Sequence, residues 1–241
     1  VCSRPVIEEM DLSSAVDKIL ATKPIALDSD DFVDKLYAEV AASGANREVI
    51  TAVHISDVHL DKEYVAGTKA KCGSYLCCRA EYGMASEGED AAGEWGSNAG
   101  VCDLPVKTFE HMMGFIADEL EPDMLFWTGD NSSHNIWSNT VDEVTDYTLD
   151  VSRIIRDALG DKPTTVVPIH GNHDTWPVNQ EDFLEKGTNY SINKIKEDWR
   201  DWLGEEAAAK YGEWGYYSMD LVLKGDKQLP PGSKVIAYNT N

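Results

Sequence analysis

Three short groups of carboxylate, imidazole and amide side chains stand directly after runs of apolar or β-branched residues in this sequence. The groups are Ser56-Asp57-Val58-His59, Gly129-Asp130-Asn131 and Gly171-Asn172-His173-Asp174. The runs that precede them, which we predict to be strands, span 49–55, 124–127 and 165–169. Because ligands of open α/β sheets gather outside the carboxyl ends of the strands, we expect the three groups to converge.

Together these groups offer the mixture of donor atoms that divalent metals bind. Asp57 and Asp130 supply carboxylates, Asn172 an amide oxygen and His59 an imidazole. Such oxygen and nitrogen donors suit hard and borderline divalent cations. A carboxylate can bridge two cations, and paired metal sites serve the displacement of phosphoesters. The pattern therefore predicts a metal site with phosphoester chemistry.

Helices between the predicted strands must hold these groups in place. They are predicted over 105–120, 140–160 and 192–203, and a hairpin is predicted from 216–223 and 234–238. We expect Pro105 at the first position of its helix, where its missing N–H costs nothing. Thr140 and Glu143 form a predicted capping box, and Gly160 is expected to close that helix. Strands alternating with helices predict an α/β fold. We expect His54 and His111, inside a strand and a helix, to be packing residues.

Composition excludes several classes of protein. The chain has 241 residues, a formal net charge of −22 and an apolar fraction of 42%. A net charge of −22 argues against binding to the phosphate backbone of nucleic acids, and against docking on an anionic membrane surface by charge alone. No apolar run approaches the ~20 residues that a membrane span needs. At this length the chain can bury a sizeable core.

The chain divides near residue 47. Residues 1–47 are acidic and predict two short helices, which we interpret as a linker or the tail of an upstream module. Residues 48–241 carry the three groups and form the predicted body of the protein. Within this body, residues 61–104 form a Gly-rich insert without regular periodicity.

Four of the five cysteines lie in this insert. They are Cys72, Cys77, Cys78 and Cys102, and the fifth is Cys2. Adjacent cysteines pair only with strain, which leaves two pairings, Cys72–Cys77 with Cys78–Cys102 or Cys72–Cys78 with Cys77–Cys102. The insert has no pair of CxxC motifs and no His, so disulfides are favoured over a metal site. Disulfides predict a secreted, extracellular or lysosomal protein, and Cys2 is expected to pair with a segment upstream of this sequence.

Several segments closely resemble the acid-sphingomyelinase-like branch of the calcineurin-like metallophosphoesterases. They are the three groups themselves, Asp61 to Gly67, Leu76 to Arg79, Trp95-Gly96, Cys102 to Pro105, Phe126 to Asp130 with His134 and Trp137, and Pro177 to Asn179. The resemblance covers about residues 49–241 and implies a β-sandwich flanked by helices. Residues 1–47 lie outside it. A saposin-like domain precedes the catalytic domain in some members, so Cys2 could be the last cysteine of such a module.

The resemblance implies a role for each matching residue of the site. Asp57 and His59 would hold one zinc, Asp130 would bridge two, and Asn172 would hold the second. His134 and His173 would face the leaving-group oxygen, stabilising charge or donating a proton. A metal-bound hydroxide would attack phosphorus in line. The substrate would be a sphingomyelin-type phospholipid or a related small phosphodiester, and a nucleotide-type phosphoester is the alternative.

The same resemblance bears on the cysteines and the glycans. It implies the pairing Cys72–Cys77 and Cys78–Cys102. It also places a glycan on Asn189, which stands in the sequon Asn189-Tyr190-Ser191. A second sequon begins at Asn131, directly after the proposed bridging Asp130, and we expect this one to be bare.

One departure from the family pattern concerns the remaining metal ligands. The family has three more histidines in its C-terminal half, whereas this sequence has no His after His173. Four of the seven ligands that the resemblance implies are therefore present. We expect the sequence to be the first part of a longer catalytic domain. The alternative is a divergent, non-catalytic extracellular structural or binding relative with an incomplete metal site.

Overall fold

The computed structural model describes residues 29–42, 48–182 and 185–239. The chain divides after Val49 into two units. The described part of the first unit contains one helix, α2 (Ser29–Ala42), in the region where the sequence predicts the second of two short helices. The other predicted helix and Cys2 lie outside the described residues. The second unit, Ile50–Asn241, contains all three groups of the site.

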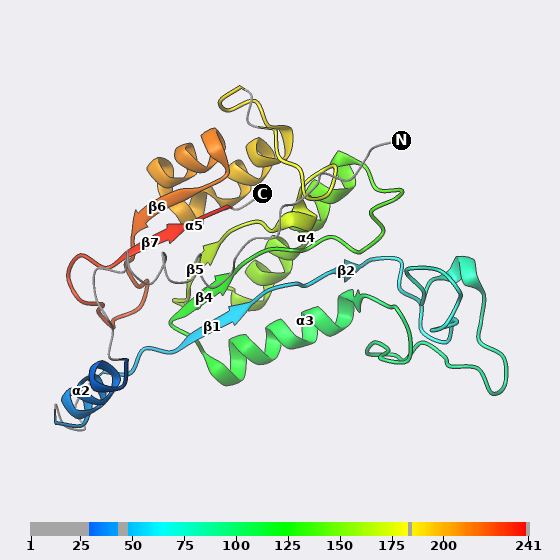
Figure 1. The fold of residues 1–241 in the computed structure, drawn as a ribbon, viewed down its shortest axis with the longest axis horizontal. Coiled ribbons are helices and arrows are strands. Elements are labelled where there is room, and N and C mark those ends of the chain that lie inside the picture. The colour runs from blue at the N-terminus through cyan, green and yellow to red at the C-terminus, as the bar shows by residue number, and fades with distance from the viewer. Residues whose placement is uncertain (1–28, 43–47, 183–184, 240–241) are drawn as a thin grey trace, which may run out of the picture. The chain divides into compact units, whose positions relative to one another are not determined.

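A parallel sheet of three strands forms the centre of the second unit (Figure 1). Its strands are β1 (Ala52–Ile55), β4 (Met124–Trp127) and β5 (Thr165–Pro168), in the order β1-β4-β5. Ile55 pairs with Trp127, and Trp127 pairs with Pro168. The last residues of all three strands are therefore in register, which brings the segments that follow them to the same edge.

Helices cover this sheet and bury its apolar side chains. They are α3 (Val106–Phe115), continued by the π-helical turn η2 (Ile116–Leu120), α4 (Val141–Leu159) and α5 (Tyr190–Trp214). Trp127 of β4 and Trp199 of α5 are fully buried, with their ring centroids 5.2 Å apart in an edge contact. The predicted capping box at Thr140 and Glu143 is present, and Gly160 follows the helix as expected.

Pro105 corrects one detail of the prediction. It is the N-cap of α3 rather than its first helical residue, with an extended ψ of 144°. The reason is that Pro105 also ends a short strand, β3 (Leu104–Pro105), which pairs in parallel with β2 (Leu60–Asp61). The φ of proline, −68° here, suits both extended and helical backbone, so the sequence alone could not decide.

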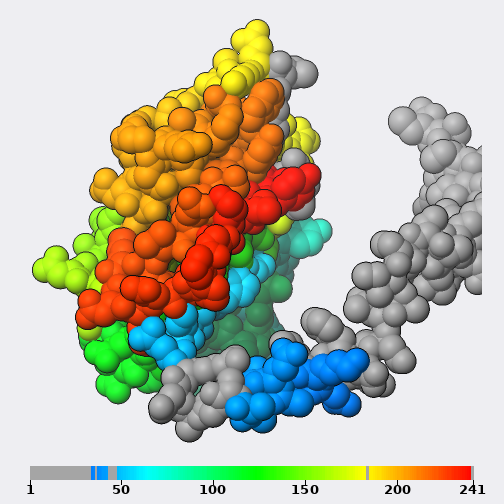
Figure 2. Space-filling view, turned by 90° about the vertical axis from the view of Figure 1, so that its left-hand side faces the viewer, coloured from blue at the N-terminus to red at the C-terminus, as the bar shows by residue number. Residues whose placement is uncertain are grey.

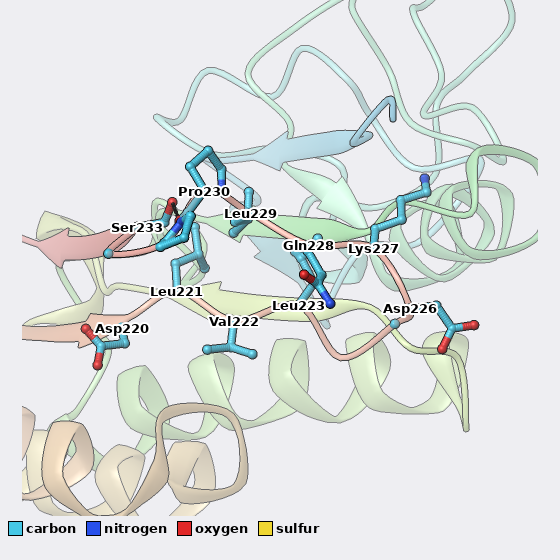
Figure 3. A pocket seen from close by; sticks show the side chains of 13 residues that line it. Asp220, Leu221, Val222, Leu223, Asp226, Lys227, Gln228, Leu229, Pro230 and Ser233 are labelled. Atoms are coloured by element: carbon cyan, nitrogen blue, oxygen red, sulfur yellow. Dashed lines mark hydrogen bonds between the residues drawn. The ribbon is translucent and has the colours of Figure 1, made fainter. Parts of the chain in front are cut away.

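The predicted hairpin is also present, as β6 (Tyr217–Asp220) and β7 (Lys234–Ala237). It lies against α5, and the space-filling view shows this contact as red and orange surfaces side by side (Figure 2). The loop between the two strands surrounds a pocket of about 520 Å³ (Figure 3). The lining comes from residues 220–233 alone, so this pocket contains none of the predicted site residues.

The cysteine-bearing insert projects from the sheet beyond β2 (Figure 1). It contains a 3-10 turn, η1 (Ala80–Tyr82), and isolated bridges rather than long elements. The structure pairs Cys72 with Cys77 and Cys78 with Cys102, both with Cα atoms 5.6 Å apart, which is the pairing that the resemblance implies. Cross-links thus hold a segment that has little regular structure of its own.

The fold is α/β, as predicted. Within the described residues the strands form one three-stranded sheet and two pairs, so the β-sandwich remains a prediction for the complete domain. In the part of the chain that is described, no helix has the length and apolarity to cross a bilayer. The packing role predicted for His54 and His111 is wrong, because both are exposed. His54 hydrogen-bonds to Thr128 at 2.9 Å, and His111 contacts the Trp95 ring.

Candidate active site

Hydrogen bonds between main chains join the first two groups beyond the ends of β1 and β4. Asp57 N–H donates to Gly129 O at 3.1 Å, and His59 N–H donates to Asp130 O at 2.9 Å. Asp57, His59 and Asp130 all have positive φ, at 54°, 39° and 56°. Residues other than glycine rarely adopt this conformation, and it concentrates at functional sites because the surroundings must enforce it.

Two glycines allow the second and third groups to touch. A Cβ atom on Gly129 would stand 2.1 Å from the backbone nitrogen of Gly171. A Cβ atom on Gly171 would stand 2.2 Å from Oδ1 of Asp130. Any larger residue at either position would push the strand ends apart, so the close approach of the two loops explains both glycines.

Asp57, His59 and Asp130 form a cluster that fits a metal ion. One donor atom from each lies within 4.8 Å of the others. His59 Nε2 is 3.9 Å from Asp57 Oδ1 and 3.9 Å from Asp130 Oδ2. With metal bonds of about 2.0–2.2 Å, two donors on one zinc lie about 3–4 Å apart, so the separations suit a shared cation.

The other ring nitrogen of His59 supports this reading. Its Nδ1 lies 3.0 Å from the carbonyl oxygen of Ser132, to which it donates. The lone pair of the neutral ring therefore lies on Nε2, the atom that faces the two carboxylates. Metal-binding histidines commonly have their second nitrogen fixed by a carbonyl in this way.

Asn172 lines the same polar pocket, of about 340 Å³, as Asp57 and Asp130. It lies in the 3-10 turn η3 (Asn172–Asp174), which begins four residues after the last residue of β5. Its Nδ2 donates to Oδ1 of Asn179 at 2.8 Å. The amide nitrogen is thereby directed to Asn179, and the amide oxygen is left as the donor atom available to a cation. Sequence reasoning gave no role to Asn179, although it stands in the quoted segment 177–179.

Three histidines meet beside this cluster. The rings of His59 and His134 stack with centroids 3.9 Å apart, and the ring of His173 lies 4.8 Å from the first and 4.9 Å from the second. Among the described residues, no group hydrogen-bonds to the buried Nδ1 of His173. Burial, together with the neighbouring His59, lowers the pKa of His173. The two histidines predicted to be catalytic therefore lie next to the predicted ligands.

Asp174 joins the loops that follow β4 and β5. Its Oδ2 accepts from the backbone N–H groups of Asp130 and Gly171, both at 2.8 Å, and its Oδ1 accepts from that of Asn131 at 2.8 Å. Its side chain is buried, and this burial raises its pKa, while the three hydrogen bonds act in the opposite direction. Sequence reasoning listed the residue within Gly171 to Asp174 but missed this function.

Asp103 is a second residue whose function was missed. Its Oδ1 lies 2.7 Å from His134 Nδ1, and its Oδ2 accepts from the backbone N–H of His134 at 2.6 Å. Two contacts from one carboxylate thus fix both the ring and the main chain of His134. The signal in the sequence was the segment Cys102 to Pro105, which carries the family resemblance but offers no hint of the partner 31 residues away.

The two sequons have different surroundings. Asn131 is fully buried, its Oδ1 accepts from Trp127 Nε1 at 2.9 Å, and its Nδ2 donates to Asp174 at 3.0 Å. This burial agrees with the expectation that Asn131 is bare. Asn189 is the N-cap of α5, and its Oδ1 accepts from the N–H of Ile192 at 3.0 Å. It is partly exposed, and a glycan on it remains a prediction.

An apolar pocket of about 640 Å³ borders His134 on its outer side. Its apolar lining comprises Tyr75, Leu76, Val101, Ile136 and Trp137. His134 and Asp103 also line it, so this pocket reaches the group of three histidines. The rings of Tyr75 and Trp137 lie 6.2 Å apart and are largely exposed. The arrangement places an apolar surface beside His134, one of the two histidines predicted to be catalytic.

Comparisons with known proteins agree with this geometry. A sphingomyelin phosphodiesterase B of Dictyostelium discoideum is 36% identical over 203 residues, which cover 83% of this chain and 30% of that protein. A human sphingomyelin phosphodiesterase is 30% identical over 191 residues, 78% of this chain and 28% of that protein. A human acid sphingomyelinase-like phosphodiesterase 3b is 29% identical over 204 residues, 82% of this chain and 40% of that protein.

The chain thus spans about 30–40% of the length of these curated relatives. The profile of the calcineurin-like phosphoesterases matches residues 50–232, which include every residue of the three groups. This family is expected to bind metals at the ends of parallel strands, and the cluster of Asp57, His59 and Asp130 lies at such a place. The chain belongs to the calcineurin-like phosphoesterase family.

Proposed function

We propose that the protein is a zinc-dependent phosphodiesterase that hydrolyses a sphingomyelin-type phospholipid. The observation that carries the proposal is the position of His59 Nε2, 3.9 Å from a carboxylate oxygen of both Asp57 and Asp130. With Asn172, these residues would hold the two metals. Two bound divalent cations supply Lewis acidity and an activated water for attack on phosphorus.

The chain's own residues prepare this site before substrate arrives. Asp130 keeps Oδ1 occupied by the N–H of His173 at 2.9 Å, which leaves Oδ2 directed toward His59. The bond from Asn172 to Asn179 directs the amide oxygen in the same manner. Donors that are oriented in advance need no rearrangement when a cation or the reacting phosphate enters.

His134 and His173 are the proposed groups at the leaving oxygen. Their rings lie 4.9 Å apart beside the ligand cluster. Both also have donor atoms within 4.8 Å of one on His59, but the group of Asp57, His59 and Asp130 does not include them. In the protonated form either can donate to the departing alkoxide, and its N–H stabilises negative charge on the phosphate. We assign them to charge stabilisation and proton donation.

The apolar pocket beside His134 supports a lipid substrate. Among the described residues that line it there is no Lys or Arg, so they offer no cation to a second phosphate group. Exposed aromatic side chains there, Tyr75 and Trp137, match the apolar body of a phospholipid. Two of the relatives described above are named for sphingomyelin. A mouse relative, 29% identical, is named a cyclic GMP-AMP phosphodiesterase, and a nucleotide-type substrate is therefore the competing assignment.

We also propose the setting of this activity. The two disulfides support a secreted, extracellular or lysosomal location. Residues 48–241 would be the N-terminal part of the catalytic domain, and residues 1–47 the linker from an upstream module, which would contain the partner of Cys2.

Substrate competition in the protein of full natural length tests the proposal. We expect hydrolysis of sphingomyelin in mixed micelles and of a nitrophenyl phosphodiester, with little turnover of cyclic dinucleotides. Faster turnover of the dinucleotide would replace the lipid assignment by the nucleotide one. Absence of turnover with every phosphodiester, in protein saturated with zinc, would favour the non-catalytic relative.

A further inference from the structure

We infer that the Cys78–Cys102 disulfide positions His134 for catalysis through the two residues that follow its cysteines, Arg79 and Asp103. The inference rests on the proposed function, because it assigns positioning residues to one of the proposed catalytic histidines. No hydrogen bond or ion pair joins Asp103 or Arg79 to Asp57, His59 or Asp130. They act through residues 133 and 134.

Asp103 makes the direct contact. Its side chain is only 8% exposed, whereas that of His134 is 48% exposed. A half-exposed histidine has several rotamers open to it, so a fixed orientation requires an anchor. The carboxylate supplies this anchor at two points, the ring Nδ1 at 2.7 Å and the backbone N–H at 2.6 Å.

The contact also selects a tautomer of His134. A carboxylate accepts hydrogen bonds, so Nδ1 of His134 donates to Asp103 and carries the proton in the neutral ring. The lone pair is then on Nε2, at the other end of the ring. Asp103 thus determines which nitrogen of His134 is free to exchange a proton with substrate.

Arg79 fixes Ser133, the residue before His134. Its side chain is 4% exposed and binds Asp61 through Nε and one terminal nitrogen, both at 3.0 Å. The same terminal nitrogen donates to Oγ of Ser133 at 3.3 Å. Asp61 lies in β2, so Arg79 ties the insert, the short β2–β3 pair and the loop before His134 to one another.

The disulfide brings these two contacts together. Cys78 precedes Arg79, Cys102 precedes Asp103, and the cystine joins the two positions across 24 residues of chain. Arg79 contacts Ser133 and Asp103 contacts His134, and these two contacted residues are neighbours in the chain. The insert has only a small core of its own around Ala70, Cys78 and Ala92, whereas the main core lies between the sheet and the helices. Removing this cystine should therefore loosen His134 without unfolding the domain.

Asp103→Asn tests the direct contact in the full-length protein. In this variant the backbone N–H of residue 134 must keep the oxygen of the new side-chain amide as its acceptor. The NH₂ group of that amide then faces Nδ1 of His134. Nδ1 can only accept a hydrogen bond from it. We expect the His134 tautomer to change from Nδ1–H to Nε2–H, as followed by NMR of ¹⁵N-histidine-labelled protein with His134→Gln for assignment. We expect kcat to fall about 100-fold with KM within about twofold. Glu87→Gln, an exposed change in the same insert, should leave the His134 tautomer, kcat and KM unchanged.

Two double variants test the role of the disulfide. Cys78→Ser/Cys102→Ser should lower kcat about tenfold or more at unchanged KM. Cys72→Ser/Cys77→Ser removes the cystine that does not join Arg79 to Asp103, and it should retain near wild-type kcat. Equal effects of the two pairs would overturn the proposed role of Cys78–Cys102, as would wild-type kcat in the first.

The outcomes separate this inference from the proposed function. If the wild-type protein hydrolyses no phosphodiester, the function fails, and the NMR spectrum still decides whether Asp103 sets the His134 tautomer. If the wild type is active but Asp103→Asn keeps its tautomer and kcat, the inference fails and the function stands. Should Asp103→Asn not fold, a wild-type His134 with its proton on Nε2 would overturn the inference.

Discussion

The backbone N–H of His173 donates to Oδ1 of Asp130 at 2.9 Å. This bond connects the proposed bridging ligand at the end of β4 to a proposed catalytic histidine at the end of β5. Because it uses the main chain of His173, it leaves the imidazole free, and it fixes which oxygen of Asp130 faces His59. The proposed ligands and the proposed catalytic histidines are therefore adjacent, and substitutions can test them separately.

Substitution of the histidines should separate catalysis from metal binding. We expect His134→Ala and His173→Ala to lower kcat on a nitrophenyl phosphodiester by about 10²- to 10⁴-fold, the usual contribution of a general acid or base. Both variants should retain wild-type zinc, measured by elemental analysis. Asp57→Ala and Asp130→Ala should lose metal and activity together. Loss of zinc from His134→Ala or His173→Ala would show that these residues are ligands.

Replacement of the buried carboxylate beneath the loops should destabilise the fold. Asp174→Asn leaves at least one of the N–H groups at Asp130, Asn131 and Gly171 without an acceptor. We expect a loss of about 3 kcal/mol in the free energy of unfolding, because unsatisfied buried groups and lost charged hydrogen bonds each cost about 1–3 kcal/mol. Denaturant unfolding measures the change, with the exposed Asp146→Asn as control. A loss equal to that of the control would refute the role given to Asp174.

Glu181 predicts a pH dependence of stability. Its side chain is 3% exposed, and burial, with a contribution from Asp174, raises its pKa from 4.5 to about 7. Nε2 of His170 lies 3.8 Å from Oε2 of Glu181, and its ring is also buried. Burial lowers the pKa of His170 from 6.5 to about 4, so both side chains are neutral between about pH 4 and pH 7. A carboxyl group with a raised native pKa stabilises the protein while protonated, and this contribution is lost as pH rises through about 7.

Glu181→Gln isolates this contribution, because His170 remains in both proteins. We expect equal melting temperatures near pH 5 and a more stable variant at pH 8, by about 1–3 kcal/mol. Glu185→Gln, an exposed change nearby, serves as the control. A variant that is less stable than wild type at pH 8 would mean that Glu181 is charged and well solvated or paired there. Higher stability at acidic pH would suit the lysosomal alternative among the proposed locations.

Local signals in the sequence predicted most elements correctly. The apolar run 124–127 is β4, and the capping box at Thr140 and Glu143 starts α4. Such features depend on neighbouring residues, which a sequence displays directly. The convergence of the three groups also followed, since parallel strands place their carboxyl ends at one edge. The roles of individual ligands remain predictions, although the structure brings Asp57, His59 and Asp130 together.

Contacts between distant segments could not be predicted in this way. Asp103 and His134 are 31 residues apart, and Asp174 reaches Asp130 across 44 residues. A carboxylate in a loop has the same appearance in a sequence whether it binds solvent or three backbone amides. His54 illustrates the reverse error, because a position inside a strand predicted burial, whereas the side chain is exposed and bonds to Thr128.

The apolar pocket predicts a substrate-dependent effect. Trp137→Ala removes a large part of its lining, and we expect KM for micellar sphingomyelin to rise about tenfold or more, as for loss of a partly buried aromatic side chain. Turnover of the small nitrophenyl phosphodiester should change by less than twofold. Trp176→Ala, an exposed tryptophan outside this pocket, provides the control. An equal loss on both substrates would show that Trp137 acts on the catalytic site rather than on the lipid.

The zinc content of the active full-length protein tests the central claim most directly. We expect about two zinc ions per chain by elemental analysis, with sphingomyelin hydrolysis lost on chelation and restored when zinc is returned. Both quantities should fall together in Asp130→Ala. Full hydrolysis in protein that contains no divalent metal would contradict the account.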